Sequence, residues 1–195
     1  MRFMFQDLMQ RAKGGEASAI EELLLPFLPA LNAFVRSRMS KGIMRRESSE
    51  DVVQSVCREV IGDLHSVRAE DQEGFRSWLF GVVHNKLRSK ESFHRAAKRD
   101  VGNELRGTLG GADPEEVLLA YGAAATPSQD AAAQEEIARI EAAFEHLSDD
   151  HSDVLRLVAI AGLTYSEAGR VLGRSEDAVR QLVHRARAKL ATLLD

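Results

Sequence analysis

Apolar residues recur at every third or fourth position along most of this chain, which is the spacing of amphipathic α-helices. The alternation of apolar and polar residues that is typical of strands is absent, and β-branched residues fall mainly inside the helical stripes. The pattern predicts helices over residues 16–39 with an interruption at Pro26 and Pro29, over 48–64, over 75–98, through 137–147 and over 152–161, with a polar loop at 65–74. The expected fold class is therefore all-α.

The last part of the chain, residues 163–194, has the pattern of a helix-turn-helix. Thr164 with Glu167 three residues later is a capping box, and Ser175 is a cap for a second helix. Gly173 lies between the two helices and suits the left-handed conformation that a short inter-helix turn requires. We therefore expect a short helix, a tight turn and a longer second helix.

The second of these helices has two chemically different faces. A buried stripe is expected at Val179, Leu182, Val183, Ala186 and Leu190, and no acid occurs between Ala178 and Leu194. Contacts with DNA are predicted for Arg174, Arg180, Gln181, His184, Arg185 and Lys189. The plainer alternative is an amphipathic helix with a basic solvent face. The capped turn and the short helix before it favour a recognition helix that lies in a DNA major groove.

Charge is distributed unevenly, although the formal net charge is only −4. Residues 86–100 hold six basic residues against two acids, whereas residues 103–136 hold seven acids and one basic residue. Two basic surfaces separated by an acidic segment predict two nucleic-acid-binding parts. Frequent Gly, Pro and Ala at 101–133 indicate a flexible acidic linker with at most a helical turn near 114–119. The linker separates two small domains, a helical bundle at 10–100 and a helix-turn-helix bundle at 134–195.

The composition argues against several classes of protein. Cys57 is the single cysteine, so no internal disulfide is possible; a small core residue is expected there, and a redox sensor is the alternative. No His or Cys cluster has the spacing of metal ligands, so neither a metal nor another cofactor is expected. No apolar run approaches the length of a membrane span, and charge interrupts the N-terminus too early for a signal peptide. We expect a cytoplasmic protein without membrane insertion.

Three motifs occur in an order that resembles a known family. They are Glu50-Asp51-Val52-Val53-Gln54, then Phe75-Arg76-Ser77-Trp78-Leu79 followed by His84-Asn85, and finally residues 163–190. Together they resemble the bacterial RNA polymerase sigma factors of the sigma-70 family, specifically the small two-domain extracytoplasmic-function (ECF) type. The resemblance covers residues 10–98 and 134–194. In that family the three segments grip core polymerase, open and read the −10 promoter element, and read the −35 element.

The resemblance implies a role for each group of residues. Glu50, Asp51 and Gln54 would contact core polymerase, although a plain helix cap is the alternative for this acidic start. The −10 element would be contacted by Phe75, Trp78, Asn85, Lys86 and Arg88, and the −35 element by the six residues of the helix-turn-helix. Aromatic rings three residues apart lie on one helix face and with nearby cations suit single-stranded DNA, but both rings are also good core residues. The loop at 65–74 corresponds to a family loop that captures a flipped promoter base.

The implied function is a non-catalytic sigma factor that binds core RNA polymerase, recognises both promoter elements and helps to open the DNA. An anti-sigma partner is plausible for this family. A stand-alone helix-turn-helix transcriptional regulator is the main alternative, but it would need a dimer interface, for which no spare apolar stripe is visible. A nuclease would need clustered carboxylates for metal ions, whereas the acids here lie at helix starts and in the linker.

The sequence departs from the family pattern at several positions. The support helix carries Ala168 and Gly169 where a large aliphatic residue and then Ala are usual, and Ser89 replaces a frequent Asp. Glycine in a helix interior costs about 1 kcal/mol, but here it would permit close approach of the recognition helix. The segment 36–47 is long and basic. A further hypothesis is that the two domains pack together in the free protein and hide their DNA-binding faces.

Overall fold

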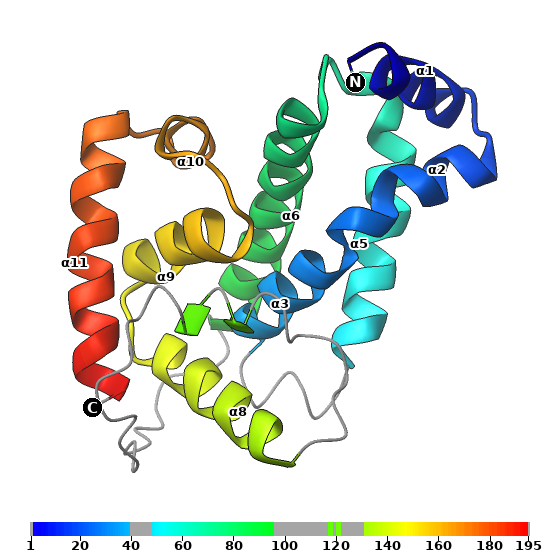
Figure 1. Cartoon of the computed structure of the whole chain (residues 1–195). Helices are drawn as coiled ribbons and strands as arrows, with labels where there is room; N and C mark the ends of the chain where they lie inside the picture. Colours follow the sequence, from blue (N-terminus) through cyan, green and yellow to red (C-terminus); the bar gives the residue numbers. More distant parts are fainter. Residues whose placement is uncertain (1, 40–47, 96–116, 119, 122–130, 195) are drawn as a thin grey trace.

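The computed structural model describes residues 2–39, 48–95, 117–118, 120–121 and 131–194. Within these ranges the chain forms helices and short connections and no strand, so the all-α prediction is confirmed (Figure 1). The elements are α1 (Arg2–Lys13), α2 (Ala17–Leu24), η1 (Leu25–Phe27), α3 (Leu28–Arg38), α5 (Ser49–Asp63), η2 (Leu64–Ser66), α6 (Gln72–Arg95), α8 (Ala131–Glu145), α9 (Asp149–Leu155), η3 (Arg156–Ile160), α10 (Tyr165–Leu172) and α11 (Glu176–Leu194). Most of the predicted linker, residues 101–133, lies outside the described residues.

The first helix, α1, is absent from the sequence-based prediction. It packs against α2 after a turn at Gly14 and Gly15, and Gly15 has the left-handed φ of 84° that such a turn needs. Met9 and Ala12 are buried against the rest of the N-terminal part. Met9 and Ala12 have helical spacing, although Asp7 and Arg11 interrupt the apolar pattern of this segment.

The interruption predicted at the two prolines is observed. A single turn of 3₁₀-helix, η1, joins α2 to α3, and Pro26 and Pro29 each lie in the first two positions of a helical segment, where the missing N–H costs no intrahelical bond. Leu31 and Phe34 of α3 are fully buried. The change of helix type keeps the apolar side chains of α2 and α3 directed into one core.

The stretch Ala17–Arg38 corrects the expectation that no apolar run approaches the length of a membrane span. Among the described residues it is long and apolar enough to cross a membrane by length and composition, with a mean hydropathy of 1.3. Core helices of soluble proteins meet the same criterion, and here Leu23, Leu31 and Phe34 are buried against other helices. The stretch is therefore accounted for by the core of this fold.

Helices α5 and α6 complete the N-terminal part. Ser48 caps α5, since its Oγ accepts a hydrogen bond of 3.1 Å from the N–H of Asp51. Helix α6 begins at Gln72, three residues before the predicted start at Phe75. The reason is that the side chain of Asp71 accepts a 2.8 Å hydrogen bond from the N–H of Gly74.

The C-terminal part consists of α8, α9, η3, α10 and α11, with α9 and α10 both packed against α11. Ser148 caps α9 with a hydrogen bond from the N–H of His151. The single helix predicted for 152–161 is divided, because its second half, Arg156–Ile160, winds as a π-helical turn. Residues 165–172 and 176–194 form the two helices of the predicted helix-turn-helix.

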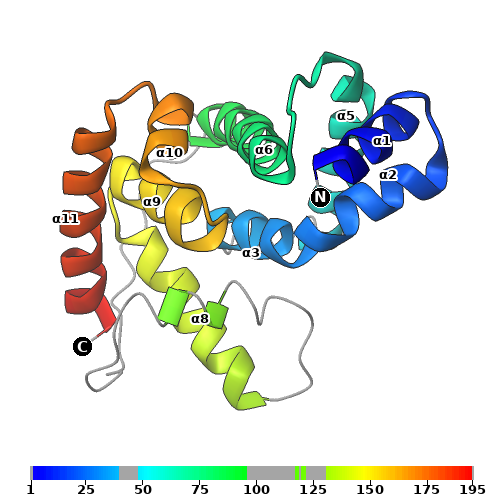
Figure 2. The same cartoon turned by 45° about the horizontal axis from the view of Figure 1, so that its top comes forward.

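The two parts lie against each other (Figures 1 and 2). Helix α3 crosses the centre of the molecule and contacts α5 and α6 on one side and α8 and η3 on the other, while α10 contacts α6. The buried apolar side chains of the described residues form one continuous cluster that includes Val117, Leu118 and Tyr121 from the predicted linker. In Figure 1, α1 lies at the upper right and the end of α11 at the lower left of the molecule.

Candidate nucleic-acid interface

The turn between α10 and α11 has the predicted geometry. Thr164 accepts a 3.2 Å hydrogen bond from the N–H of Glu167, and the Glu167 carboxylate accepts one of 2.8 Å from the N–H of Thr164. This is the reciprocal capping box. Gly173 ends α10 in the left-handed conformation with φ 65° and ψ 35°, and Ser175 caps α11 by accepting from the N–H of Ala178 at 3.3 Å.

Gly169 lies where α10 approaches this turn most closely. A Cβ atom at this position would lie 2.6 Å from the backbone oxygen of Arg174. The N–H of Arg174 donates a 2.9 Å hydrogen bond to the oxygen of Gly169, so the two backbones are in direct contact. The departure from the family pattern at this position therefore permits the close approach that the sequence predicted.

Helix α11 divides into the two predicted faces. Val179, Leu182, Val183, Ala186 and Leu190 are all buried. Arg180, Gln181, His184 and Arg185 are exposed and line a shallow hollow of about 460 Å³. Arg174 and Lys189 are exposed as well, towards the two ends of this face. The structure thus brings four of the six predicted residues together at one hollow and leaves all six exposed.

Two arginines of this surface already have acidic neighbours. Arg180 forms ion pairs with Glu176 at 2.9 Å and Asp177 at 3.2 Å, and its guanidinium lies over the ring of Tyr165. Arg174 forms an ion pair with Asp150 at 2.7 Å. Because these pairs are exposed to solvent, each contributes only about 0–1 kcal/mol and can be exchanged for an anionic ligand at small cost.

The aromatic residues predicted to contact DNA on α6 differ in exposure. Phe75 is fully buried, with its ring centroid 6.3 Å from that of Phe5 and 5.6 Å from that of Phe27. Trp78 is half-buried and stacks on Phe75 with ring centroids 5.7 Å apart. In this conformation Phe75 is a core residue and does not reach the surface, whereas part of the Trp78 ring does.

The polar residues predicted on the same helix also differ from one another. Asn85 and Arg88 are exposed. Lys86 instead turns towards α5, where it forms an ion pair with Glu59 and donates a 3.4 Å hydrogen bond to the backbone oxygen of Ser55. Asn85 and Arg88 are therefore accessible to a ligand as they stand, and Lys86 must first leave its partners.

The acidic start of α5 forms a separate surface. Glu50, Asp51 and Gln54 are exposed, while the valines next to them, Val52 and Val53, are buried as the sequence predicted. Carboxylates in the first turn are stabilised by the positive end of the helix dipole. The start of α5 thus presents exposed carboxylates to solvent.

Redox and metal chemistry have little support in the described residues. Cys57 is half-buried and packs against the core, and burial raises the pKa of its thiol, which disfavours the reactive thiolate. This agrees with the expected core role. Within the described parts of the chain, no group of three or more His, Cys, Asp and Glu side chains could hold a metal ion.

Comparison with known proteins decides the family. Residues 143–192 match the family described as Sigma-70, region 4. The chain is 28% identical over 184 residues to the ECF RNA polymerase sigma factor SigD of Mycobacterium tuberculosis, which is 94% of this chain and 80% of SigD. It is 36% identical over 150 residues to RNA polymerase sigma factor CnrH of Cupriavidus metallidurans, which is 75% of this chain and 73% of CnrH. The chain belongs to the sigma-70 family as an ECF sigma factor.

The fold agrees with this assignment. The sigma factor resembles the solved structure of CnrH in complex with the cytosolic domain of CnrY, with a TM-score of 0.63 and 28% identity over 96% of this chain and 95% of that one. The family predicted from the three motifs is confirmed. The protein is a soluble, non-enzymatic sigma factor that directs RNA polymerase to promoters. The alternatives of a stand-alone regulator and a nuclease are set aside.

Proposed function

We propose that this sigma factor recognises the −35 element with the exposed face of α11. The supporting observation is that Arg180, Gln181, His184 and Arg185 line one shallow hollow on the helix that follows the capped turn. Such side chains suit a major groove, where arginine pairs with guanine and glutamine with adenine. Arg174 and Lys189 flank the hollow and are assigned to phosphates, which position the helix without reading sequence.

The −10 element is assigned to α6 and the loop at 65–74 before it. The exposed part of Trp78 stacks on an unpaired base, and Asn85 and Arg88 hold the strand, since aromatic and cationic side chains together suit single-stranded DNA. Lys86 joins them by exchanging Glu59 for a phosphate. Phe75 acts from the core, where its ring fixes the orientation of Trp78.

The contact with core polymerase is assigned to the first turn of α5. Glu50, Asp51 and Gln54 offer carboxylate and amide groups that suit a basic partner surface, and the buried valines beside them keep this turn rigid. The functional units are residues 10–100, extended by α1 to Arg2, and residues 134–195, with the segment 101–133 between them.

A protein partner that restrains the sigma factor and a cytoplasmic location complete the proposal. CnrH, which resembles this chain along most of its length, was solved in complex with the cytosolic domain of another protein, CnrY. An anti-sigma partner of that kind would bind where the sigma factor meets polymerase. RNA polymerase and an anti-sigma partner would both place this sigma factor in the cytoplasm, where transcription takes place.

Two assays test the proposal. The first measures the affinity of the sigma factor for purified core RNA polymerase, and the second measures run-off transcription from a promoter that the holoenzyme selects. The double variant Asp51→Ala, Gln54→Ala is expected to lose at least tenfold in polymerase affinity and to lose promoter-specific transcripts in proportion. Asp63→Ala is the matched control, because it removes an exposed acid from the other end of the same helix. Equal affinity of the double variant and the control would contradict the assignment of this surface.

A further inference from the structure

The last turn of α3 is tied to the C-terminal part by three consecutive residues. Arg36 forms an ion pair of 3.0 Å with Glu141 of α8. The backbone oxygen of Ser37 accepts a 2.7 Å hydrogen bond from Arg156 of η3, and the Ser37 hydroxyl accepts a second one of 3.2 Å from the same guanidinium. Arg38 forms an ion pair of 3.2 Å with Asp153 of α9.

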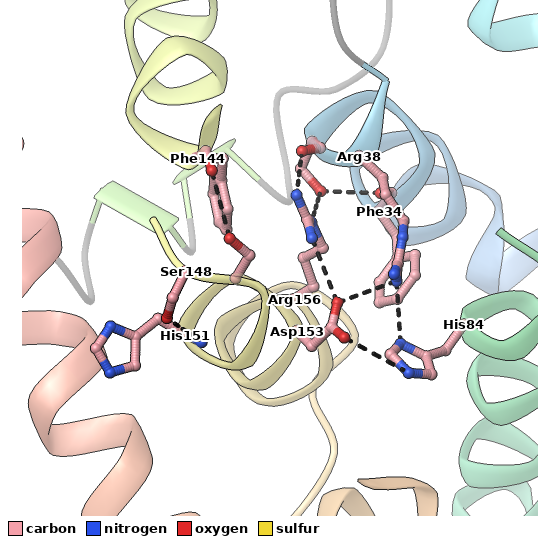
Figure 3. A network of polar contacts seen from close by, with 10 residues as sticks. Phe34, Arg38, His84, Phe144, Ser148, His151, Asp153 and Arg156 are labelled. Carbon is pink, nitrogen blue, oxygen red and sulfur yellow. Dashed lines mark hydrogen bonds and ion pairs between the residues drawn. The ribbon is translucent and has the colours of Figure 1, made fainter. Parts of the chain in front are cut away.

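Asp153 is the centre of the larger of two polar clusters at this contact (Figure 3). Its carboxylate lies 3.2 Å from Arg38, 3.4 Å from Arg156 and 3.8 Å from the Nε2 atom of His84 on α6. All four side chains are buried. Arg156 also lies over the ring of Phe144, so the cluster connects α3, α6, α9, η3 and the end of α8.

Glu141 is the centre of the smaller cluster. It pairs with Arg36, and it accepts a 3.1 Å hydrogen bond from the hydroxyl of Tyr121. Tyr121 comes from the segment between the two parts, and its ring is buried. Removing one member of a buried charged group leaves the others without a counter-charge, which is strongly unfavourable. The two clusters therefore favour one arrangement of the N- and C-terminal parts.

This arrangement does not allow both promoter elements to be read at once. Helix α10 lies directly on α6, since a Cβ atom at Gly81 would be 3.5 Å from Val171. Arg76 of α6 also donates a 3.4 Å hydrogen bond to the backbone oxygen of Gly162, in the connection before α10. By their names the −10 and −35 elements are about 25 base pairs apart, which is about 85 Å at 3.4 Å per base pair. The −10 helix and the helix-turn-helix must therefore separate before the protein spans a promoter.

We propose that the last turn of α3, Arg36-Ser37-Arg38, is a latch that holds the free sigma factor in a closed, inactive state through Glu141, Arg156 and Asp153. Polymerase binding opens the latch, because polymerase can contact both the N-terminal and the C-terminal part only after these two parts have separated. The apparent affinity for polymerase is reduced by the fraction of chains that are closed. The inhibitory effect rests on the proposed function, whereas the closure itself does not.

The first test measures closure without polymerase. Arg36→Glu places two carboxylates opposite each other, and Glu141→Arg does the same with two cations. Neither residue is in the centre of its own part, so both variants are expected to keep their helices by circular dichroism. Small-angle scattering should give a radius of gyration of about 16 Å for a closed chain of this length, and a value several ångströms larger for each single variant.

The double variant Arg36→Glu, Glu141→Arg restores an ion pair with the charges exchanged and should return to the wild-type radius. Arg11→Glu is the control for the charge change, because the ion pairs of Arg11 lie within and next to α1. Equal radii for Arg36→Glu, Glu141→Arg and Arg11→Glu would overturn the latch. Two enlarged single variants without recovery in the double variant would also overturn it, because the effect would then not depend on this pair.

The second test measures inhibition. Both opened variants should half-saturate core polymerase at a concentration at least threefold lower than the wild type, and the double variant should not. Chains that open without any gain in polymerase affinity would overturn the inhibitory role. This outcome is distinct from a failure of the proposed polymerase contact, which is measured by Asp51→Ala, Gln54→Ala in the same assay.

Discussion

At the scale of single residues, Gly169 shows how one missing side chain sets the geometry of the helix-turn-helix. The oxygen of Arg174 occupies the space where a Cβ would lie, at 2.6 Å. Backbone atoms at such a place cannot move without moving the turn and the start of α11. Glycine is therefore required here for packing, despite its cost of about 1 kcal/mol within a helix.

Gly169→Ala is expected to lower the free energy of unfolding by about 1–3 kcal/mol, because the strain of an overpacked contact exceeds the gain in helix propensity. Gly62→Ala is the matched control, since Gly62 is also helical and its added Cβ would meet nothing within 4 Å. The control should gain about 0.5–1 kcal/mol. Urea denaturation of both variants measures the difference, and a stabilised Gly169→Ala would contradict the close contact.

At the scale of elements, the exposed face of α11 combines two kinds of basic residue. Arg185 lines the hollow together with Arg180, Gln181 and His184, whereas Lys189 lies one turn further along the helix. A residue in the hollow can reach base edges, and a residue beyond it reaches the sugar-phosphate backbone. The two positions should therefore affect promoter binding in different ways.

Arg185→Ala is expected to weaken holoenzyme binding to the selected promoter by about 5–150-fold, which corresponds to about 1–3 kcal/mol, and to weaken binding to a promoter with an altered −35 element much less. Lys189→Ala should weaken both by a similar factor and lower the slope of log K against log salt by about 0.9. Filter binding at several salt concentrations separates the two. Identical profiles for the two variants would contradict the division of roles.

At the scale of the whole molecule, the contact between the two parts determines the state of His84. Arg38 donates a 3.1 Å hydrogen bond to Nδ1 of His84, so the ring proton resides on Nε2, which faces Asp153. Burial is the main cause that lowers the pKa of His84 to about 4; Asp153 opposes this shift, and Arg38, Arg88 and Arg156 add to it. The closed arrangement thus requires a neutral His84.

The closed state should lose stability as the pH falls from about 6.5 to about 4, because an opened or unfolded chain then binds a proton on His84 that the closed chain does not. Above pH 6.5 this group contributes no pH dependence. The loss at pH 5.5 relative to pH 7.5 is expected to be about 1 kcal/mol.

Urea denaturation of wild type and His84→Gln at the two pH values measures this effect. Burial raises the pKa of Glu141, which favours closure in acid and partly offsets the loss, so the relevant quantity is the difference between the two proteins. An equal pH dependence of wild type and His84→Gln would contradict the assignment.

Much of this protein follows from local sequence. The sequence predicts the caps at Thr164 and Ser175, the turn at Gly173 and the two faces of α11, because each depends on residues within one or two helical turns of each other. The sequence predicts the family as well, since each of the three motifs is a continuous stretch of the chain. The start of α6 differs from the prediction because Asp71, within the predicted polar loop, caps the helix.

Which polar and aromatic residues are accessible depends on contacts between distant parts of the chain. Phe75 and Trp78 have the same helical spacing signal, yet Phe75 is buried because Phe5 and Phe27, about 70 and 48 residues earlier, cover it. The pairing of the basic end of α3 with Glu141 and Asp153 also joins residues more than 100 positions apart. No local pattern encodes such contacts, because they depend on how complete helices pack and on which charges that packing removes from water.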